Sequence, residues 1–314
     1  IKVVELATAL AGPGVGRYLA DFGAEVIKVE SPQGDPTRRM GWTGTNESDS
    51  YFWKLVNRNK SVISLDLKIS ENKEILWAII KDVDVLIENF RPGKLAKLGF
   101  SSEELLKANP KLVILRLTGF GQTGPYSSYP GFATIVDALS GFSNLLGEPQ
   151  GTPSLPPIAL ADELTALVGA FSVMLALRHA EKRGEGQEID VNLLTSMFQI
   201  MGALPSAYAH MGYLQPRLGS GIPYTVPRGT YKSSDNIWLA ISCSSDSVSD
   251  RVLNLLGLND DPRFVNFQSR SKNRELLEGY VKEWIGKRTY SEVLDKFRQA
   301  DAAVGKVMSM EEIF

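Results

Sequence analysis

The chain has 314 residues, 43% of them hydrophobic and 22% charged, and 34 basic and 36 acidic side chains leave a net charge of −2. At roughly 150 residues per domain, this length predicts about two globular domains. The near balance of charge excludes a general attraction to nucleic acid or to an anionic membrane. Cys243 is the single cysteine, so no intramolecular disulfide can form, and only two histidines are present, which predicts no metal site of the Cys/His type.

No apolar run approaches the roughly 18–20 residues that span a bilayer, and no signal-peptide pattern is present. We therefore expect a cytoplasmic protein without a membrane partner. The chain opens on a strand-like run at residues 1–6 and stops in a helix-like run at 311–314. We therefore expect both ends to be incomplete.

Strands alternate with helices through the first two thirds of the chain. Apolar runs predict strands at residues 1–6, 25–29, 62–67, 83–87, 112–117 and 188–192. Helices are predicted at residues 15–22, 70–80, 162–183 and from the sixth strand to about 210. Ser101 and Glu104 form a capping box ahead of a further helix. This alternation predicts an α/β fold with a mostly parallel, Rossmann-like sheet covered on both faces.

The pattern changes after residue 212. Residues 213–228 are rich in glycine and proline and are predicted to be a linker between a large domain, 1–212, and a small domain, 229–314. Within the small domain we expect strands at 229–232 and 238–242 and helices at 246–256, 273–287 and 291–300. This mixture is typical of a small α+β domain.

Residues 12–17 read Gly-Pro-Gly-Val-Gly-Arg between the first strand and the first helix. A dinucleotide fingerprint needs G-x-G-x-x-G at this point and an acid at the end of the next strand. Glu30 has the place of that acid, but Arg17 stands where the third glycine allows close packing. We therefore expect no NAD cofactor, while a glycine loop before a helix still suits phosphate or amide groups.

Basic residues gather in the loops predicted at or near the ends of the strands, and a ligand with several phosphates would suit them. They are Arg38, Arg39, Arg58, Lys60, Lys68, Arg91, Lys94 and Lys97. A solvated surface with scattered charges is an equally good interpretation. Asn89, Phe90 and Arg91 are more specific because they follow a strand directly and offer an amide, a ring and a guanidinium to a nucleotide.

Asp162 stands at the predicted start of a long helix, where an aspartate is most often an N-cap. The preceding residues, 156–161, are mostly apolar, so the carboxylate is expected to be partly desolvated. The helix N-terminus favours its negative charge, and a carboxylate attacks an activated partner such as a thioester. Asp162 is therefore the candidate nucleophile.

Together these stretches resemble the family III CoA-transferases, also called the CaiB/BaiF family, a superfamily that includes formyl-CoA transferases and 2-methylacyl-CoA racemases. The matching stretches are residues 3–6, 11–13, 21–30, 57–60, 88–93, 118–125 and 161–162. The resemblance covers essentially the whole chain. It implies a Rossmann-like large domain, a small domain, a C-terminal return segment that this chain lacks, and a homodimer of two interlocked ring-shaped chains.

The resemblance also implies a mechanism. The aspartate that matches Asp162 attacks an acyl-CoA thioester, and a mixed anhydride and then an aspartyl-CoA thioester form on it. Coenzyme A enters as the acyl-CoA substrate, and no metal, NAD or ATP is required. The CoA-binding positions carried over from the family are Leu10, Ala11, Leu65, Leu67, Lys68, Asn89, Phe90, Arg91 and Lys97.

Three alternatives compete with a transferase. Racemases of the family use a histidine opposite the aspartate in a Gly-His-Asp stretch, because two bases are needed to remove and return a proton. Here that stretch is Gly131-Phe132-Ala133, and phenylalanine carries no proton. A non-catalytic CoA-binding protein and an NAD-dependent oxidoreductase are the other two.

The substrate acid is only weakly indicated. Arg217 and Arg228 flank a glycine-containing stretch at 219–223, and arginine near an active site suits a second carboxylate. We expect a dicarboxylate such as succinate as donor or acceptor, with Phe132 and Arg228 as substrate-binding residues. The alternative is that both arginines are surface or linker residues.

Overall fold

The computed structural model describes residues 1–45 and 48–314 and divides them into two compact units. Unit 1 comprises residues 1–143 and 155–210, and unit 2 comprises residues 144–154 and 211–314. The segment 213–228, which the sequence predicts to be a linker, groups with unit 2. Each unit is described below by itself.

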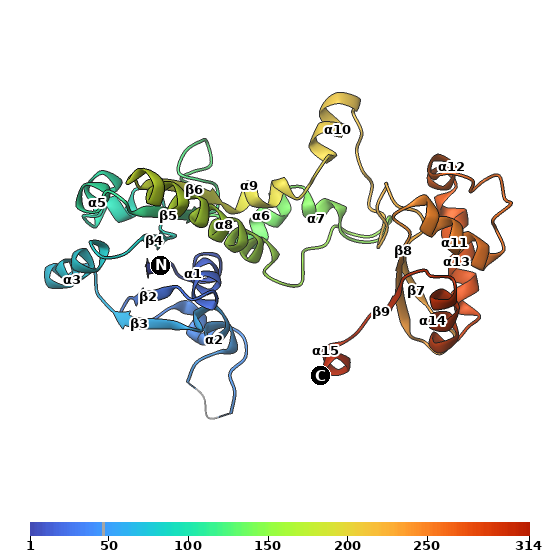
Figure 1. Cartoon of the computed structure of the whole chain (residues 1–314), viewed down its shortest axis with the longest axis horizontal. Coiled ribbons are helices and arrows are strands. Elements are labelled where there is room, and N and C mark those ends of the chain that lie inside the picture. Colours follow the sequence, from blue (N-terminus) through green and yellow to red (C-terminus); the bar gives the residue numbers. More distant parts are fainter. Residues whose placement is uncertain (46–47) are drawn as a thin grey trace. The chain divides into compact units, whose positions relative to one another are not determined.

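Six strands of unit 1 form one parallel sheet in the order β3-β2-β1-β4-β5-β6 (Figure 1). The strands are β1 Lys2–Glu5, β2 Glu25–Glu30, β3 Lys60–Ser64, β4 Val85–Glu88, β5 Val113–Thr118 and β6 Gln187–Asn192. The predicted α/β class and parallel sheet are confirmed. All six strands were expected within a few residues of these bounds.

Helices lie between these strands and after β6. They are α1 Ala11–Asp21, η1 Pro36–Arg39 (a 3-10 turn), α2 Tyr51–Asn57, α3 Ser70–Ile80, α4 Lys94–Lys97, α5 Ser102–Ala108, α6 Ala133–Leu139, α7 Phe142–Leu145, α8 Leu160–Arg183, α9 Leu193–Gln199 and α10 Leu204–Met211. The last residues of α7 and α10 belong to unit 2. The capping box of Ser101 and Glu104 begins α5 as predicted. Two predictions were wrong. The glycine segment 12–17 lies inside α1 rather than in a loop, and the helix expected up to residue 210 is two helices, α9 and α10.

The two faces of the sheet bury separate apolar cores, because alternate residues of a strand point to opposite faces. Val3, Val85 and Leu115 face α1, α6, α8 and α9. Val4 and Leu86 face α3, α4 and α5 instead. The inner strands β1, β4 and β5 are therefore largely buried between two layers of helices, while the edge strands β3 and β6 are partly exposed.

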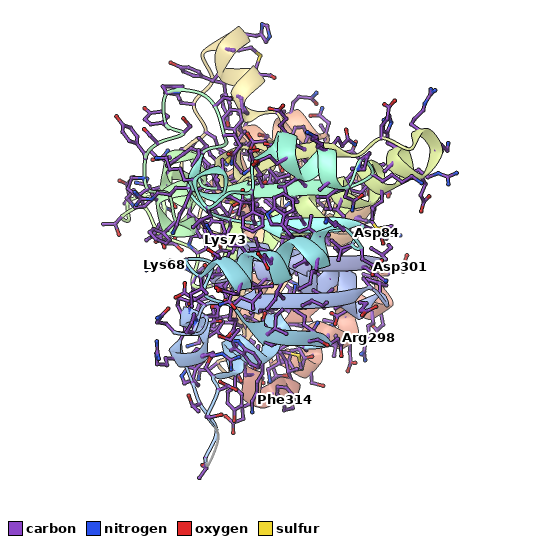
Figure 2. The ribbon with its side chains drawn as sticks, turned by 90° about the vertical axis from the view of Figure 1, so that its left-hand side faces the viewer. Lys68, Lys73, Asp84, Arg298, Asp301 and Phe314 are labelled. Atoms are coloured by element: carbon purple, nitrogen blue, oxygen red, sulfur yellow. The ribbon has the colours of Figure 1, made fainter. Side chains whose placement is uncertain are left out.

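The strand order reverses between β1 and β4. Both strands pair in parallel with each other, but the chain leaves β1 toward β2 and leaves β4 toward β5. In Figure 2, Lys68 follows β3 and Asp84 precedes β4, and the two lie at opposite ends of the sheet. Lys68 therefore marks the carboxyl edge, where open α/β sheets bind ligands at such a reversal.

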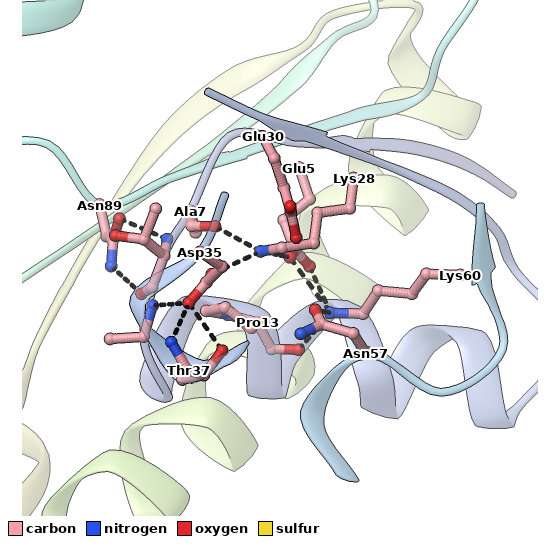
Figure 3. A network of polar contacts seen from close by, with 12 residues as sticks. Glu5, Ala7, Pro13, Lys28, Glu30, Asp35, Thr37, Asn57, Lys60 and Asn89 are labelled. Atoms are coloured by element: carbon pink, nitrogen blue, oxygen red, sulfur yellow. Dashed lines mark hydrogen bonds and ion pairs between the residues drawn. The ribbon is translucent and has the colours of Figure 1, made fainter. Parts of the chain in front are cut away.

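Two buried lysines organise that edge (Figure 3). The Nζ atom of Lys28, on β2, lies 3.1 Å from Glu5 Oε1 and 3.0 Å from Asp35 Oδ2. It also donates to the main-chain oxygen of Ala7 over 2.8 Å. The side chains of Lys28, Glu5 and Asp35 are 0% exposed. Such charges are tolerated in an interior only when they are paired, so these residues must be placed together.

Lys60 extends the same network to α1. Its Nζ atom lies 2.9 Å from Glu5 Oε2 and donates to the main-chain oxygen of Pro13 over 2.7 Å. Burial outweighs the attraction of Glu5 and lowers the pKa of Lys60 to about 8. A Cβ at Gly16 would lie 1.9 Å from Glu5 Oε2, so α1 can approach the network only with glycine at that position.

Helix α8 is long and apolar enough to cross a membrane by length and composition alone. This corrects the expectation that no apolar run approaches that length. Its inner side, with Ala166 and Val173, belongs to the core of unit 1. Its other side is also apolar, and there Leu167, Phe171 and Leu175 are exposed. The helix is therefore a core helix with a second apolar side that no described residue covers.

Unit 2 carries a three-stranded antiparallel sheet in the order β7-β8-β9. Its elements are β7 Arg228–Lys232, β8 Trp238–Ser242, α11 Asp246–Leu256, α12 Phe267–Lys272, α13 Arg274–Gly286, α14 Tyr290–Gln299, β9 Val304–Lys306 and α15 Met310–Ile313. Leu239, Val252, Val281 and Phe297 form its core. The expected small domain with both helices and strands is confirmed.

Replacing Lys28 by Met should lower the free energy of unfolding by about 3–5 kcal/mol, because it leaves buried Asp35 without its lysine and Glu5 with Lys60 as its remaining ion-pair partner. Urea unfolding followed by circular dichroism measures the change. Lys2→Met is the control, since Lys2 pairs with Asp82 at the surface and its removal should change little. Equal stability of Lys28→Met and the parent protein would contradict the structural role of the network.

Candidate active site

The loops that follow β1 and β4 are joined by the side chain of Asn89. Its Oδ1 atom accepts from the backbone N–H of Thr8 over 3.0 Å, and its Nδ2 group donates to the oxygen of Thr8 over 2.7 Å. Asp35 adds a longer contact, accepting from the N–H of Ala9 over 3.4 Å. The network around Lys28 therefore continues into the loop that precedes α1 (Figure 3).

A cavity of about 490 Å³ opens at this edge of the sheet, and every residue that lines it belongs to unit 1. Its walls come from the loops after β1, β4 and β5, from Met40 at the end of η1, and from the first turns of α1, α6, α8 and α9. The lining residues are Thr8, Ala9, Leu10, Ala11, Met40, Asn89, Phe90, Arg91, Pro92, Leu117, Thr118, Gly119, Phe120, Ser127, Tyr129, Pro130, Gly131, Phe132, Ala133, Thr134, Asp162 and Leu193. Arg91 and Asp162 are the charged residues among them.

Asp162 is a half-buried residue in the first turn of α8. The N-cap of α8 is Ala159, so the interpretation of Asp162 as the helix cap was wrong. Burial, and next the charges of Asp137 and Glu163, raise the pKa of Asp162 to about 6. At neutral pH the carboxylate is therefore still ionised, but it is more basic than an ordinary aspartate. A basic carboxylate at a cavity wall is suited to nucleophilic attack.

Helix α1 holds the start of α8 in place. The guanidinium of Arg17, only 4% exposed as a residue, donates to Glu163 Oε1 over 2.5 Å, and the hydroxyl of Tyr18 donates to the same oxygen over 3.2 Å. A Cβ at Gly14 would lie 2.7 Å from Cβ of Ala166, so the two helices touch where Gly14 has no side chain. Arg17, which displaces the third glycine of a dinucleotide fingerprint, thus fixes the turn that carries Asp162.

The cavity brings together seven of the residues singled out in the sequence. They are Leu10, Ala11, Asn89, Phe90, Arg91, Phe132 and Asp162. Leu65 and Leu67 pack instead in the core on the α3 side of the sheet, while Lys68 and Lys97 are exposed. Arg228 begins β7 in unit 2 and donates to the main-chain oxygen of Ser220 over 2.5 Å.

Three of the basic residues expected to attract phosphates form ion pairs with acidic residues of unit 1. Arg38 pairs with Glu30 and Asp49, Arg58 pairs with Asp21, and Lys60 belongs to the buried network. Arg58 is exposed in spite of its ion pair, and the other exposed cations from that set are Arg39, Lys68, Arg91, Lys94 and Lys97. The charge available to a polyphosphate is therefore smaller than the sequence indicated, because ion pairing between distant segments cannot be read from a pattern of charges.

Both carboxylate oxygens of Glu30 also accept hydrogen bonds. The indole N–H of Trp53 donates to its Oε1 atom over 3.0 Å, and Nε of Arg38 donates to Oε2 over 2.9 Å. In dinucleotide-binding proteins the acid at this place must be free to bind the ribose hydroxyls. The occupied carboxylate, like the buried side chain of Arg17, disfavours an NAD site.

The sequence did not reveal Asp137, which does not line the cavity but whose negative charge helps to raise the pKa of Asp162. Asp137 lies on α6, a short helix that was not predicted, and it is 3% exposed. A single aspartate within an apolar stretch gives no local signal, and only its burial close to Asp162 distinguishes it. Within the described ranges, 1–45 and 48–314, no three or more His, Cys, Asp or Glu side chains are grouped so as to hold a metal ion.

Comparison with known proteins gives a consistent result. The model of CoA-transferase family III matches residues 1–314. The chain is 36% identical over 319 residues to the succinyl-CoA–L-malate CoA-transferase alpha subunit of Chloroflexus aurantiacus, a match that covers 100% of this chain and 74% of the relative. It is also 36% identical to the succinate–glutarate CoA-transferase of Agrobacterium fabrum, covering 100% of this chain and 80% of that one.

Among solved structures, a CAIB/BAIF family protein from Brucella suis resembles the chain with a TM-score of 0.86 at 33% identity. That match covers 100% of this chain and 84% of the other. The arrangement of a six-stranded parallel sheet and a separate small antiparallel sheet therefore agrees with structures of that family.

The carboxyl group of Asp162 should titrate with a midpoint near 6. Carbon-13 NMR of protein labelled at its aspartate carboxyl carbons measures this, and the resonance lost in Asp162→Asn assigns the signal. Asp261 is an internal control, because its hydrogen bonds with Arg263 hold the pKa of that carboxyl below the ordinary value. A midpoint for Asp162 at or below about 4 would contradict the desolvated site.

Proposed function

This chain belongs to CoA-transferase family III, and we propose on that basis that it moves CoA from an acyl-CoA thioester to a free carboxylic acid through a covalent intermediate on Asp162. The observation that carries the proposal is the basic, half-buried carboxylate of Asp162 in the wall of the cavity. The cavity lies where the strand order reverses, which is the expected ligand site of such a sheet.

The proposed reaction has two exchange steps in each direction. A carboxylate oxygen of Asp162 attacks the thioester carbonyl, CoA thiolate leaves, and a mixed anhydride remains. The thiolate then attacks the Asp162 carbonyl of that anhydride, so the first acid leaves as a carboxylate and an aspartyl-CoA thioester forms. The incoming carboxylate reverses both steps. The number of thioester bonds is conserved, so the exchange needs no outside source of energy.

The surroundings of Asp162 suit this chemistry. Its raised pKa means a more basic and hence more nucleophilic carboxylate that is still ionised at neutral pH. The first turn of α8 presents backbone N–H groups that lack partners within the helix, and we propose that they stabilise the oxyanions that develop during acyl transfer. Apolar walls around the cavity favour the thioester over competing water.

We propose that CoA lies along the carboxyl edge of the sheet. Leu10, Ala11 and Phe90 would contact the pantetheine arm, and the exposed side chains of Arg91, Lys68 and Lys97 would contact phosphates. Asn89 would act mainly by holding the loop after β1 in its shape, since both ends of its amide are bonded to Thr8. Leu65 and Leu67 would support the nucleotide end from the core beneath it.

The racemase alternative is disfavoured by the composition of the cavity wall. Phe132, 73% exposed, stands in the cavity where a racemase of this family needs its second base. No histidine is among the lining residues, all of which lie in the described part of unit 1. A non-catalytic CoA-binding role would not require the raised pKa of Asp162.

We propose a dicarboxylate, such as succinate, as donor or acceptor acid. The relatives named above are a succinyl-CoA–L-malate and a succinate–glutarate CoA-transferase, and both names contain dicarboxylic acids. Phe132 would contact the acyl chain, and Arg228 of unit 2 would bind the second carboxylate. Arg228 has a main-chain acceptor, Ser220, rather than a carboxylate partner within the described residues.

We propose further that the protein works as a homodimer in the cytoplasm. The exposed apolar side of α8, with Leu167, Phe171 and Leu175, is a surface that a second copy can cover. Light scattering of the purified protein tests the dimer, and a monomeric mass at micromolar concentration would exclude it.

Incubation with succinyl-CoA followed by hydroxylamine should convert Asp162 to a hydroxamate, because hydroxylamine attacks both the anhydride and the thioester. Peptide mass spectrometry measures the product. Asp162→Asn should show no modification, whereas Asp82→Asn should keep it, since Asp82 is an exposed carboxylate that pairs with Lys2 away from the cavity. An unmodified Asp162 across a panel of acyl-CoA donors, with rapid exchange of the substrate α-proton in deuterium oxide, would favour the racemase instead.

Arg228→Ala should raise the KM for a dicarboxylate acceptor by about tenfold, the usual cost of one lost charge-assisted hydrogen bond. Steady-state kinetics with succinate measures it, and a monocarboxylate such as propionate, whose KM should not change, is the matched control. An unchanged KM for succinate would remove Arg228 from the site.

A further inference from the structure

Asp137 is a buried carboxyl group that the proposed reaction does not yet use. It lies on α6, whose first turn lines the cavity through Ala133 and Thr134. Asp137 follows these residues by four and three positions, so its side chain leaves the helix on the same side as theirs. Helix α6 packs against α8, which carries Asp162, and against α9.

The buried carboxyl group of Asp137 is not balanced by hydrogen bonds to its Oδ1 atom from the described residues. The residue is 3% exposed, and its Oδ1 atom is buried without a hydrogen-bond partner among the described residues. The hydroxyl of Ser140 donates to the main-chain oxygen of Asp137 and not to its carboxyl group. Burial raises the pKa of Asp137. Leaving a buried polar group unsatisfied costs about 1–3 kcal/mol, and more if the group is charged, whereas an apolar side chain of similar shape would avoid that cost.

Helix α8, which packs against α6, carries Asp162 and Glu163 in its first turn. Glu163 is already paired with Arg17 and hydrogen-bonded by Tyr18. The other neighbour, α9, contains no charged residue. Among these groups the uncompensated charge is therefore that of Asp162. After burial, the negative charges of Asp137 and Glu163 both raise the pKa of Asp162.

We propose that Asp137 is a positioning residue for acyl transfer, whose unpaired negative charge keeps the Asp162 carboxylate basic and is relieved when Asp162 becomes acylated. The inference rests on the proposed role of Asp162 as nucleophile. In the free enzyme two like charges repel each other across α6 and α8. In the mixed anhydride and in the aspartyl-CoA thioester Asp162 is neutral, so the repulsion disappears and the covalent states are favoured relative to the free enzyme.

Two substitutions separate charge from hydrogen bonding. Asp137→Asn removes the charge and keeps a polar side chain, while Asp137→Leu removes both. Asp82→Asn is the control for a lost carboxylate, because Asp82 is exposed and pairs with Lys2 away from the cavity. Each variant is examined by carbon-13 titration of Asp162, by kcat/KM for succinyl-CoA between pH 5 and 8, and by thermal unfolding.

In both Asp137 variants the midpoint of Asp162 should fall by about half a unit, since one repelling charge is gone. The ratio of kcat/KM at pH 5 to that at pH 8 should then rise by roughly two- to threefold, because more of the nucleophile is ionised in acid. The KM for the CoA donor should not change, and the melting temperature should not fall. A purely structural role for Asp137 predicts a lower melting temperature and no change in either pH profile.

An Asp162 midpoint that stays at its parental value in both variants overturns the proposal. A shift in Asp137→Leu but not in Asp137→Asn also overturns it, because hydrogen bonding rather than charge would then be responsible. The NMR titration does not depend on turnover. If Asp162 shifts as expected but never becomes acylated, the electrostatic link stands and the transferase mechanism fails.

Discussion

Four buried charges at the carboxyl end of β1 and β2 hold the loop on which the cavity depends. Lys28 and Lys60 share Glu5, and Lys28 also binds Asp35 (Figure 3). Removing any one of these residues leaves an unpaired charge in the interior, so the network forms as a unit or not at all. Because the lysines also bind main-chain oxygens of the loop after β1 and of α1, this electrostatic requirement determines the shape of the backbone beside the cavity.

The buried network influences the position of Asp162, the proposed nucleophile, through the packing of α1 against α8. Helix α1 is held at its base by the network and meets α8 where Gly14 allows close contact. The ion pair of Arg17 and Glu163 then fixes the first turn of α8. Asp162 is thereby placed at the wall of the cavity and partly removed from water, which makes it basic. Within the proposed mechanism, the same burial that organises unit 1 gives the carboxylate its reactivity.

The regular elements were largely predictable because their signals are local. Each strand of the parallel sheet is a short, mostly apolar run, and the box of Ser101 and Glu104 marks a helix start within four residues. The errors occurred where tertiary contacts override local preference. The glycines of segment 12–17 normally indicate a loop, yet they lie inside α1 because the buried network and α8 leave no room for side chains there. The short helices α6 and α7 carry no comparable signal and were missed.

The sequence by itself identified the family, the alternation of strands and helices, and Asp162 with much of the cavity wall, because those features are written in consecutive residues. Only the tertiary structure decided which charges are free. It placed Arg38 and Lys60 in ion pairs. Among the described residues it left the Oδ1 atom of Asp137 without a hydrogen-bond partner, on a helix that packs against α8. The physical reason is that pairing and desolvation depend on distances between residues far apart in the chain, and a pattern of residue types along the chain contains no such distances.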